Sequence, residues 1–235
     1  MVVFSEAMTG RVGRGPNRSS PDGATASSGA LSFGSIVHGN EKGGNFGGTE
    51  EYLSLVTSEL RRRGVSSYLV CGVLGGPGPL EFDSFHVVEG LASREPLLQV
   101  GPQLVQLIGL LDPDVIYLHN MFDPVAVWAV SAIPNRGPLI WYVHDHYLTC
   151  LSELRWRRDH GSCRERLGAG CLVAINEGRC VLRRPERVLD ADELGRRKTL
   201  SRSLGQADQV IVVSEYMRSL LAEAEPRLAE RIHVL

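Results

Sequence analysis

Short apolar runs alternate with longer amphipathic segments along most of this chain, beginning near Leu31. The runs have the length and composition of β-strands, and the run at 115–119 is almost continuously apolar, as in strands that are covered on both faces. Strands are expected at 32–38, 67–71, 85–88, 115–119, 139–144, 209–213 and 231–235.

The amphipathic segments between these runs have the spacing of α-helices. The clearest is 49–63, whose leucine and valine side chains recur on one face. Acidic residues open this segment, and Gly64 follows it as a C-cap. Further helices are expected at 96–111, 124–133, 188–204 and 214–224. The alternation of strands and helices predicts an α/β fold, a Rossmann-like doubly wound parallel sheet.

Two segments break this alternation. Residues 1–30 are dominated by Gly, Ser, Pro, Arg and Ala and lack hydrophobic periodicity, so we expect a disordered tail. Residues 145–186 are rich in Arg, Gly and Cys with no clear period, so we expect an irregular insertion there. The folded domain is therefore expected to span 31–235, with the insertion inside it.

Composition places the chain among soluble globular proteins. Of its 235 residues, 43% are hydrophobic and 22% are charged. No window approaches the roughly 18 consecutive apolar residues of a membrane-spanning helix, and the N-terminus lacks the apolar core of a secretory signal. We therefore expect a cytoplasmic location. The net charge of −2 argues against a protein that binds nucleic acid.

Ligands of doubly wound sheets bind at the carboxyl ends of the strands, so the residues that follow each strand are the candidates for a site. After the first strand, Gly47 and Gly48 stand in a glycine-rich loop directly before a helix. Exposed N–H groups and the helix dipole favour an anion such as a phosphate there. The loop has neither the Walker pattern nor the dinucleotide-binding pattern. A flexible loop without a ligand is the alternative interpretation.

Histidines follow two further strands. His119 with Asn120, and His144 with Asp145, can each hydrogen-bond a sugar hydroxyl or a phosphate. A single histidine in such a place is more often structural. Two of them at neighbouring strand ends, opposite a glycine loop, favour a binding site.

Four cysteines fall in the predicted insertion, separated by 12, 7 and 8 residues: Cys150, Cys163, Cys171 and Cys180. Structural zinc sites usually contain C-x2-4-C pairs, and this pattern is absent. We therefore expect reduced thiols that stabilise the insertion and no metal, with a metal site as the less favoured alternative.

Arginine is concentrated in residues 155–202, which hold 12 Arg and Lys198 against 7 acidic residues. Most such runs form a solvated face with internal ion pairs, and we favour that interpretation. The alternative uses of this charge are binding of a phosphate-bearing substrate and peripheral contact with an anionic membrane at its inner face.

Four motifs occur in order along the chain: Gly-Gly-Thr-Glu-Glu-Tyr before a helix, Pro-Asp-Val-Ile-Tyr-Leu-His-Asn, Trp-Tyr-Val-His-Asp-His-Tyr and Ala-Asp-Gln-Val-Ile-Val-Val-Ser-Glu. Together they resemble the N-terminal domain of family 4 glycosyltransferases of the GT-B fold, over roughly residues 31–235. The resemblance implies transfer of a sugar, with retention of configuration, from a nucleotide-diphosphate sugar to an acceptor. It also implies that the reaction takes place in a cleft between two Rossmann-like domains. The sugar donor is a substrate, and no cofactor is implied.

The same resemblance assigns roles to individual residues. Gly47 and Gly48 match the loop that faces the donor phosphate and the acceptor. His144 matches the cleft histidine that contacts the transferred sugar, which makes it the candidate catalytic residue. Ser214 and Glu215 match the loop after the sixth strand. With the strand-end residues above, the expected substrate-binding set is Gly47, Gly48, His119, Asn120, Asp145, Ser214 and Glu215.

The resemblance also implies a C-terminal domain that holds the nucleotide and that these residues do not include. The expected partners are therefore a sugar acceptor, the nucleotide sugar and that second domain. The expected function is that of the acceptor-binding half of a glycosyltransferase, inactive on its own. Two alternatives stay open: a stand-alone, non-catalytic α/β module that binds a sugar or nucleotide, and half of a sugar-nucleotide epimerase, which shares the GT-B architecture.

Overall fold

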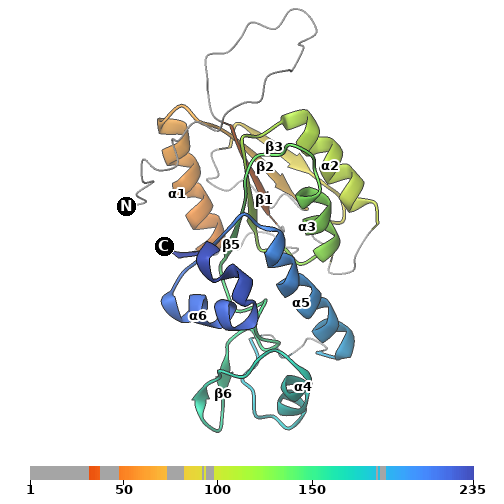
Figure 1. Cartoon of the computed structure of the whole chain (residues 1–235), viewed down its shortest axis with the longest axis vertical. Coiled ribbons are helices and arrows are strands. Elements are labelled where there is room, and N and C mark those ends of the chain that lie inside the picture. Colours follow the sequence, from red (N-terminus) through yellow and green to blue (C-terminus); the bar gives the residue numbers. More distant parts are fainter. Residues whose placement is uncertain are drawn as a thin grey trace, which may run out of the picture.

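A parallel sheet of seven strands forms the centre of the described part of the protein, shown as a computed structural model in Figure 1. The structure describes residues 32–37, 48–72, 82–91, 93, 98–183, 185 and 189–235. The predicted tail at 1–30 and the glycine-rich loop up to Gly47 lie outside the described residues.

The order of the strands reverses near the middle of the sheet. The strands are β1 (Ser32–Val37), β2 (Ser66–Cys71), β3 (Ser84–Val87), β4 (Val115–His119), β5 (Leu139–Val143), β8 (Gln209–Val212) and β9 (Ile232–Val234). They lie in the order β3-β2-β1-β4-β5-β8-β9, and every neighbouring pair is parallel. β1 and β4 are therefore neighbours in space but not in sequence. In doubly wound sheets, ligands bind in the crevice outside the carboxyl ends of the strands at such a reversal.

Helices connect the strands and begin where the sequence supplies capping groups. Asp123, Asp190 and Ser214 each accept a hydrogen bond from a backbone N–H in the first turn of the following helix. The helices are α1 (Gly48–Arg62), α2 (Val100–Leu111), α3 (Pro124–Ser131), α4 (Ala169–Asn176), α5 (Ala191–Ser203) and α6 (Glu215–Ala224). No helix in these described ranges is long and apolar enough to cross a membrane. The structure confirms the predicted doubly wound α/β fold.

The sheet separates two cores. α1 packs on one face, where its Leu53 contributes to a small cluster with Leu69 of β2. Side chains of α2, α3, α5 and α6 share a larger cluster with the sheet, which includes Val70 of β2 and Trp141 of β5. Leu69 and Val70 belong to different cores because successive side chains of a strand point to opposite faces.

Asp208, which precedes β8, fixes the amino ends of the central strands. One of its carboxylate oxygens accepts hydrogen bonds from the backbone N–H of Leu139 and from the guanidinium of Arg136, both at 2.7 Å. Gly137 passes so close to β4 that a Cβ built on it would lie 2.0 Å from the carbonyl oxygen of Asp114. The amino edge of the sheet is therefore tightly packed.

The sequence predicts an irregular segment at 145–186, and the structure corrects this prediction in part. The segment contains the short antiparallel strands β6 (Trp156–Arg157) and β7 (Gly161–Ser162), and also helix α4. Figure 1 shows β6 and α4 in a lobe that projects from the sheet, below α5 in this view. Elements this short carry no readable hydrophobic period, so their formation depends on contacts with more distant residues. We call residues 149–183 the insertion lobe.

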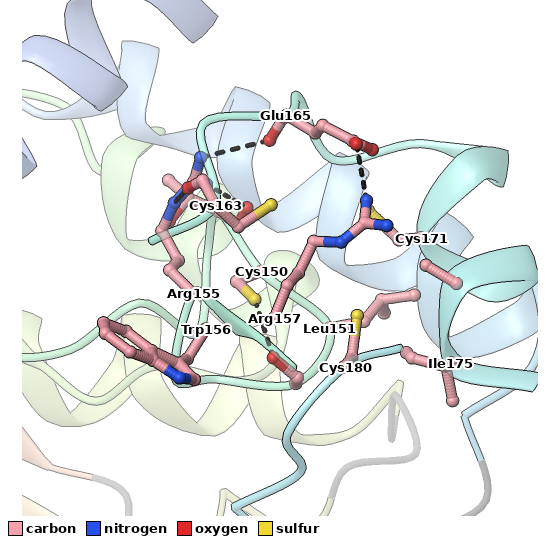
Figure 2. Close-up of a pocket in the computed structure, with 13 residues that line it drawn as sticks. Cys150, Leu151, Arg155, Trp156, Arg157, Cys163, Glu165, Cys171, Ile175 and Cys180 are labelled. Atoms are coloured by element: carbon pink, nitrogen blue, oxygen red, sulfur yellow. Dashed lines mark hydrogen bonds and ion pairs between the residues drawn. The ribbon is translucent and has the colours of Figure 1, made fainter. Parts of the chain in front are cut away.

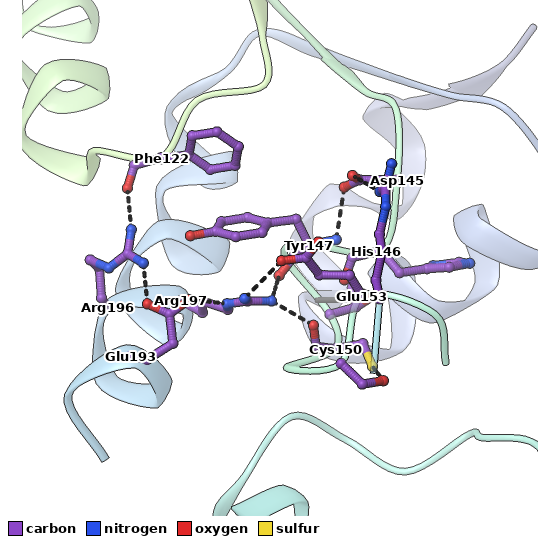
Figure 3. Close-up of polar contacts among 12 residues, drawn as sticks. Phe122, Asp145, His146, Tyr147, Cys150, Glu153, Glu193, Arg196 and Arg197 are labelled. Atoms are coloured by element: carbon purple, nitrogen blue, oxygen red, sulfur yellow. Dashed lines mark hydrogen bonds and ion pairs between the residues drawn. The ribbon is translucent and has the colours of Figure 1, made fainter. Parts of the chain in front are cut away.

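Arg197 of α5 ties the insertion lobe to the sheet. Its side chain is completely buried and donates to the carbonyl oxygens of Tyr147 at 3.2 Å and Cys150 at 2.7 Å. It also forms ion pairs with Glu153 at 3.1 Å and with Glu193 at 2.6 Å. Figure 3 shows these contacts meeting at one guanidinium. A network of charges and hydrogen bonds therefore fixes the base of the lobe.

Two helices begin later than predicted. α2 begins at Val100 instead of residue 96, and α5 begins at Ala191, after its cap Asp190, instead of residue 188. Residues 94–97 and 186–188 lie outside the described residues. For α5 the physical reason is the cap, because an aspartate whose side chain accepts from the first turn fixes the start of a helix.

Candidate functional site

Two histidines meet at the carboxyl edge of the sheet, next to the reversal in strand order. His119 is the last residue of β4, and His144 directly follows the neighbouring strand β5. His119 Nδ1 lies 2.9 Å from His144 Nε2, within hydrogen-bond distance. The structure therefore brings together two residues that the sequence placed at separate strand ends.

Both imidazoles are neutral at physiological pH. His119 is completely buried, and burial lowers its pKa well below the usual 6.5; repulsion from a protonated His144 lowers this pKa further. Burial also lowers the pKa of His144 to about 4, although Asp145 opposes this shift. A hydrogen bond between two neutral rings needs one donor and one acceptor, so each ring holds a defined tautomer.

The remaining ring nitrogens decide which tautomer each histidine holds. His119 Nε2 is buried without a hydrogen-bond partner among the described residues. A buried N–H without a partner is less well tolerated than a buried lone pair, so His119 carries its hydrogen on Nδ1 and donates it to His144. His144 then carries its own hydrogen on Nδ1, which makes no hydrogen bond within the described part of the chain. The site thus presents one imidazole N–H that can donate to a ligand.

Aromatic side chains surround the histidine pair. Tyr52 of α1 packs against Tyr142 and His144, with ring centres 4.6 Å and 5.8 Å apart. Its hydroxyl lies 3.0 Å from that of Tyr117, and burial raises the pKa of Tyr52 to about 12. Tyr117 and His119 pack edge to face, with ring centres 4.3 Å apart. These rings hold both imidazoles in place beneath α1.

The first turn of α1 is joined to the end of β4. Asn120 follows His119 with a φ of 45°, a left-handed conformation that asparagine tolerates better than most residues. Its side-chain amide donates to the Thr49 hydroxyl at 3.0 Å. Gly48 is exposed, and no described atom lies within 4 Å of the position that a Cβ would take. The N-terminus of α1, where anions are favoured, therefore lies beside the histidine pair.

Asp145 supports the backbone at the start of the insertion. One carboxylate oxygen accepts a hydrogen bond from the backbone N–H of Tyr147 at 2.9 Å, and the other forms an ion pair with Arg183 at 3.0 Å. Both oxygens are thus engaged by the protein. The effect of Asp145 on the neighbouring His144 is electrostatic, because its negative charge raises the pKa of that imidazole.

Ser214 and Glu215 lie at the same edge of the sheet but apart from the histidine contacts. Ser214 caps α6 by accepting a hydrogen bond from the backbone N–H of Met217 at 3.2 Å. Glu215 is exposed in the first turn of α6 and lies 3.3 Å from Arg218. No hydrogen bond within the described residues joins either side chain to the histidine pair, and Gly47 lies outside those residues.

The four cysteines of the insertion line one cavity, which Figure 2 shows. Cys150 lies before β6, Cys163 follows β7, Cys171 lies in α4, and Cys180 pairs with Arg157 in an isolated bridge. All four are half-buried, and none is in a disulfide. Their spacing in the sequence gave no signal of this convergence, which the fold of the insertion lobe creates.

The arginines of residues 155–202 form the internal ion pairs that the sequence predicted. Ion pairs with acidic residues involve Arg157, Arg179, Arg183, Arg196 and Arg197. Arg155 is buried and donates to backbone carbonyls instead. Much of the charge in this segment is therefore engaged inside the lobe and at its contact with α5.

Sequence reasoning missed the tyrosines around the histidine pair. Tyr117 precedes His119 by two residues, and Tyr142 precedes His144 in the same way, so each tyrosine shares a strand face with its histidine. This repeated Tyr-x-His pattern is a usable signal. Tyr52 carries no such signal, because its contact with the pair depends on how α1 crosses the sheet.

One known protein family matches most of the described chain. The model of glycosyltransferase family 4 matches residues 46–235, which include α1, the histidine pair and the insertion lobe. No match was found among curated proteins. The family match takes in well over half of the sequence and the whole of the site described above. The chain therefore belongs to glycosyltransferase family 4.

Proposed function

We propose that this chain is the acceptor-binding half of a glycosyltransferase. The enzyme would move a sugar from a nucleotide-diphosphate donor to a glycan, lipid or small-molecule acceptor with retention of configuration. Membership of the family supports the reaction class. The reversal in strand order between β1 and β4 supports a ligand crevice at the carboxyl edge of the sheet. The donor is a substrate, and the proposal includes no cofactor.

The observation that carries this proposal is the free N–H of His144 at that edge. A neutral imidazole whose other nitrogen is held by a buried histidine donates in a fixed direction. Such a donor suits a sugar hydroxyl or the oxygen between sugar and phosphate. His144 is therefore the group that touches the transferred sugar. His119 is completely buried, so in this proposal it positions His144. This role replaces the direct contact with substrate that the sequence predicted for His119.

The N-terminus of α1 is the proposed place for the donor diphosphate. Gly47 and Gly48 lead into that helix, whose first N–H groups favour a negative charge. Negative charge develops on the diphosphate as the sugar departs, and groups that stabilise this charge accelerate the reaction. One helix N-terminus supplies only part of this stabilisation, and the C-terminal domain of the enzyme supplies the rest. The chain alone is then expected to bind an acceptor without turning over the donor.

Turnover by a two-part enzyme tests the proposal. The chain is joined to a family 4 C-terminal domain and given UDP-linked and GDP-linked sugars with a pool of glycan and lipid acceptors. Release of nucleoside diphosphate and the mass of the product are measured. We expect His144→Gln to lower the rate by about 10²- to 10³-fold, as the loss of one directed donor does in other enzymes. His233→Gln, at an exposed position in β9, is the matched control.

The outcomes separate the proposal from its alternatives. Full turnover by the chain alone, or an unchanged rate in His144→Gln, would contradict it. Conversion of the nucleotide sugar to an epimer without any acceptor would favour the epimerase half. Binding of sugars with no turnover in any joined enzyme would favour the non-catalytic module.

A further inference from the structure

Four thiols that are distant in the sequence surround one small cavity in the insertion lobe. Cys150, Cys163, Cys171 and Cys180 come from a turn, a strand end, a helix and an isolated bridge, and all four line the cavity. Figure 2 shows the four cysteines together with Arg157, which lines the same cavity. The cavity volume is about 20 Å³, which admits about one occupant the size of a water molecule.

The insertion lobe has only a small apolar core. Between residues 149 and 183, the buried apolar side chains of the described residues are those of Leu151 and Ala174. The buried polar or charged side chains in the same range are those of Thr149, Ser152, Glu153, Arg155 and Arg157. Units of fewer than about 40 residues usually need disulfides, metals or oligomerisation in addition to a hydrophobic core. The four thiols at the centre of the lobe are suited to supply such a cross-link.

A buried cation at the wall of the cavity lacks a counter-charge. The side chain of Arg155 is 4% exposed and lines the cavity. Its guanidinium donates to three carbonyl oxygens, at 2.8 Å, 2.9 Å and 3.1 Å, and no carboxylate of the described residues forms an ion pair with it. Carbonyl oxygens satisfy its N–H groups but do not neutralise its charge, and a buried charge without a counter-charge is unfavourable. An anionic centre inside the cavity would provide that counter-charge.

We propose that Cys150, Cys163, Cys171 and Cys180 form a structural site for one Zn²⁺ ion. Four thiolates bind zinc tetrahedrally at Zn–S distances of about 2.3 Å. Binding releases the four thiol protons to solvent and leaves a dianionic centre, which the buried Arg155 at the cavity wall offsets. The charge of Arg157 is already paired with Asp159 and Glu165. A cavity of this size suits a single ion.

The thiols move inward to bind the ion. Within the described residues, no three histidine, cysteine, aspartate or glutamate side chains already stand in a metal-binding arrangement. Two of the sulfurs are held by weak contacts, since Cys150 Sγ lies 3.1 Å from Ser152 Oγ and Cys171 Sγ lies 3.8 Å from the carbonyl oxygen of Arg166. Rotation about the Cα–Cβ bonds of Cys150 and Cys171 breaks these contacts at little cost in free energy.

Disulfide formation is the competing chemistry. Two disulfides would also cross-link the lobe, but they would divide the thiols into separate pairs and leave Arg155 without an anion. The single cavity shared by all four thiols, together with the buried cation beside it, favours the metal.

Metal analysis of the intact chain, purified under reducing conditions without chelator, tests the proposal. We expect about one zinc ion per chain by plasma mass spectrometry. The amount of zinc released should rise in proportion to the number of lobe thiols modified by a mercurial reagent. The chain refolded with Co²⁺ alone should show the intense bands of tetrahedral cobalt thiolate. Removal of zinc by a chelator should make the lobe more sensitive to protease while the sheet stays folded.

Cys163→Ser and Cys71→Ser are matched variants. Cys71 is buried in β2 and does not line the cavity. Under competition with a chelator, we expect Cys163→Ser to retain at least about tenfold less zinc than the unmodified chain. We expect Cys71→Ser to retain as much zinc as the unmodified chain. Arg155→Met should weaken zinc retention by about 10- to 100-fold. If Cys163→Ser does not fold, the mercurial and cobalt measurements on the unmodified chain decide the question.

Three results would overturn the proposal. They are four reduced lobe thiols with no bound metal, two disulfides detected by mass in the chain as purified, and iron in place of zinc. The experiment measures metal and thiols, so its outcome does not depend on glycosyl transfer.

Discussion

The guanidinium carbon of Arg197 lies 4.0 Å from the ring centre of Tyr147, so a cation–π contact accompanies the ion pairs of this buried side chain. We expect Arg197→Met to lower the free energy of unfolding by about 3–5 kcal/mol, because it removes the cation that Glu153 and Glu193 both contact. Lys198→Met, at the exposed neighbouring position, should change it by less than about 0.5 kcal/mol. Urea denaturation measures both values, and equal losses would contradict the role assigned to Arg197.

The histidine pair makes stability depend on pH. The unfolded chain binds protons at histidine near pH 6.5, whereas burial lowers the folded pKa of His119 and lowers that of His144 to about 4. The stability that the neutral pair contributes is therefore complete above pH 6.5 and is lost as the pH falls toward 4. We expect His119→Asn to flatten this dependence in urea denaturation, and His233→Gln, at an exposed site, to leave it close to that of the unmodified chain. A slope that is unchanged in His119→Asn would contradict the assignment.

Two glycines should respond in opposite directions to the same substitution. Gly137→Ala places a Cβ 2.0 Å from the carbonyl oxygen of Asp114, so we expect a loss of about 2–4 kcal/mol in the free energy of unfolding. Gly109→Ala meets no described atom within 4 Å and lies in the interior of α2. It should stabilise the chain by about 0.5–1 kcal/mol through the better helix propensity of alanine. Thermal unfolding of both variants measures these changes in stability. An unchanged stability of Gly137→Ala would show that β4 and β5 are less closely packed.

Ser214 can be tested as a helix cap. Ser214→Ala removes the acceptor for the backbone N–H of Met217 and should cost about 1 kcal/mol of stability. Ser214→Asp retains an acceptor at that place and should recover most of the loss. Ser219→Ala, further along the same helix, should lie within about 0.5 kcal/mol of the unmodified chain. Equal losses in the alanine and aspartate variants at Ser214 would contradict capping.

The sheet and the place of the candidate site could be predicted from the sequence because both follow from local patterns. β4 and β5 are apolar runs that end in or next to a histidine, and parallel strands present their carboxyl ends at one edge. The complete burial of His119 could not be predicted, because it depends on the cover that α1 and Tyr52 provide. The direct contact between the two imidazoles likewise depends on side-chain directions that periodicity does not encode.

The insertion lobe shows the limit of such reasoning. β6 and β7 are two residues long each, too short for any period. The residues around β6 and β7 are held by contacts between positions far apart in the sequence. One example is the hydrogen bond from the Arg197 guanidinium to the carbonyl oxygen of Cys150. The meeting of the four cysteines is a product of these contacts and cannot be read from spacings of 12, 7 and 8 residues.

The tight packing around Asp208 and Gly137 makes the amino edge of the sheet less tolerant of substitution than the carboxyl edge. The contacts of Asp208 and Gly137 hold β4, β5 and β8 together at the amino edge, while the candidate site lies at the carboxyl edge. Under the proposed function, substitutions at half-buried positions of the carboxyl-edge loops would alter which acceptor is recognised without shifting the strands from which the loops emerge. A laboratory library that seeks new acceptors under the proposed function should therefore randomise the half-buried Asn120 and His146 and keep Met121, Asp123, Gly137 and Asp208 unchanged, since the frame of the sheet is then the same in every member.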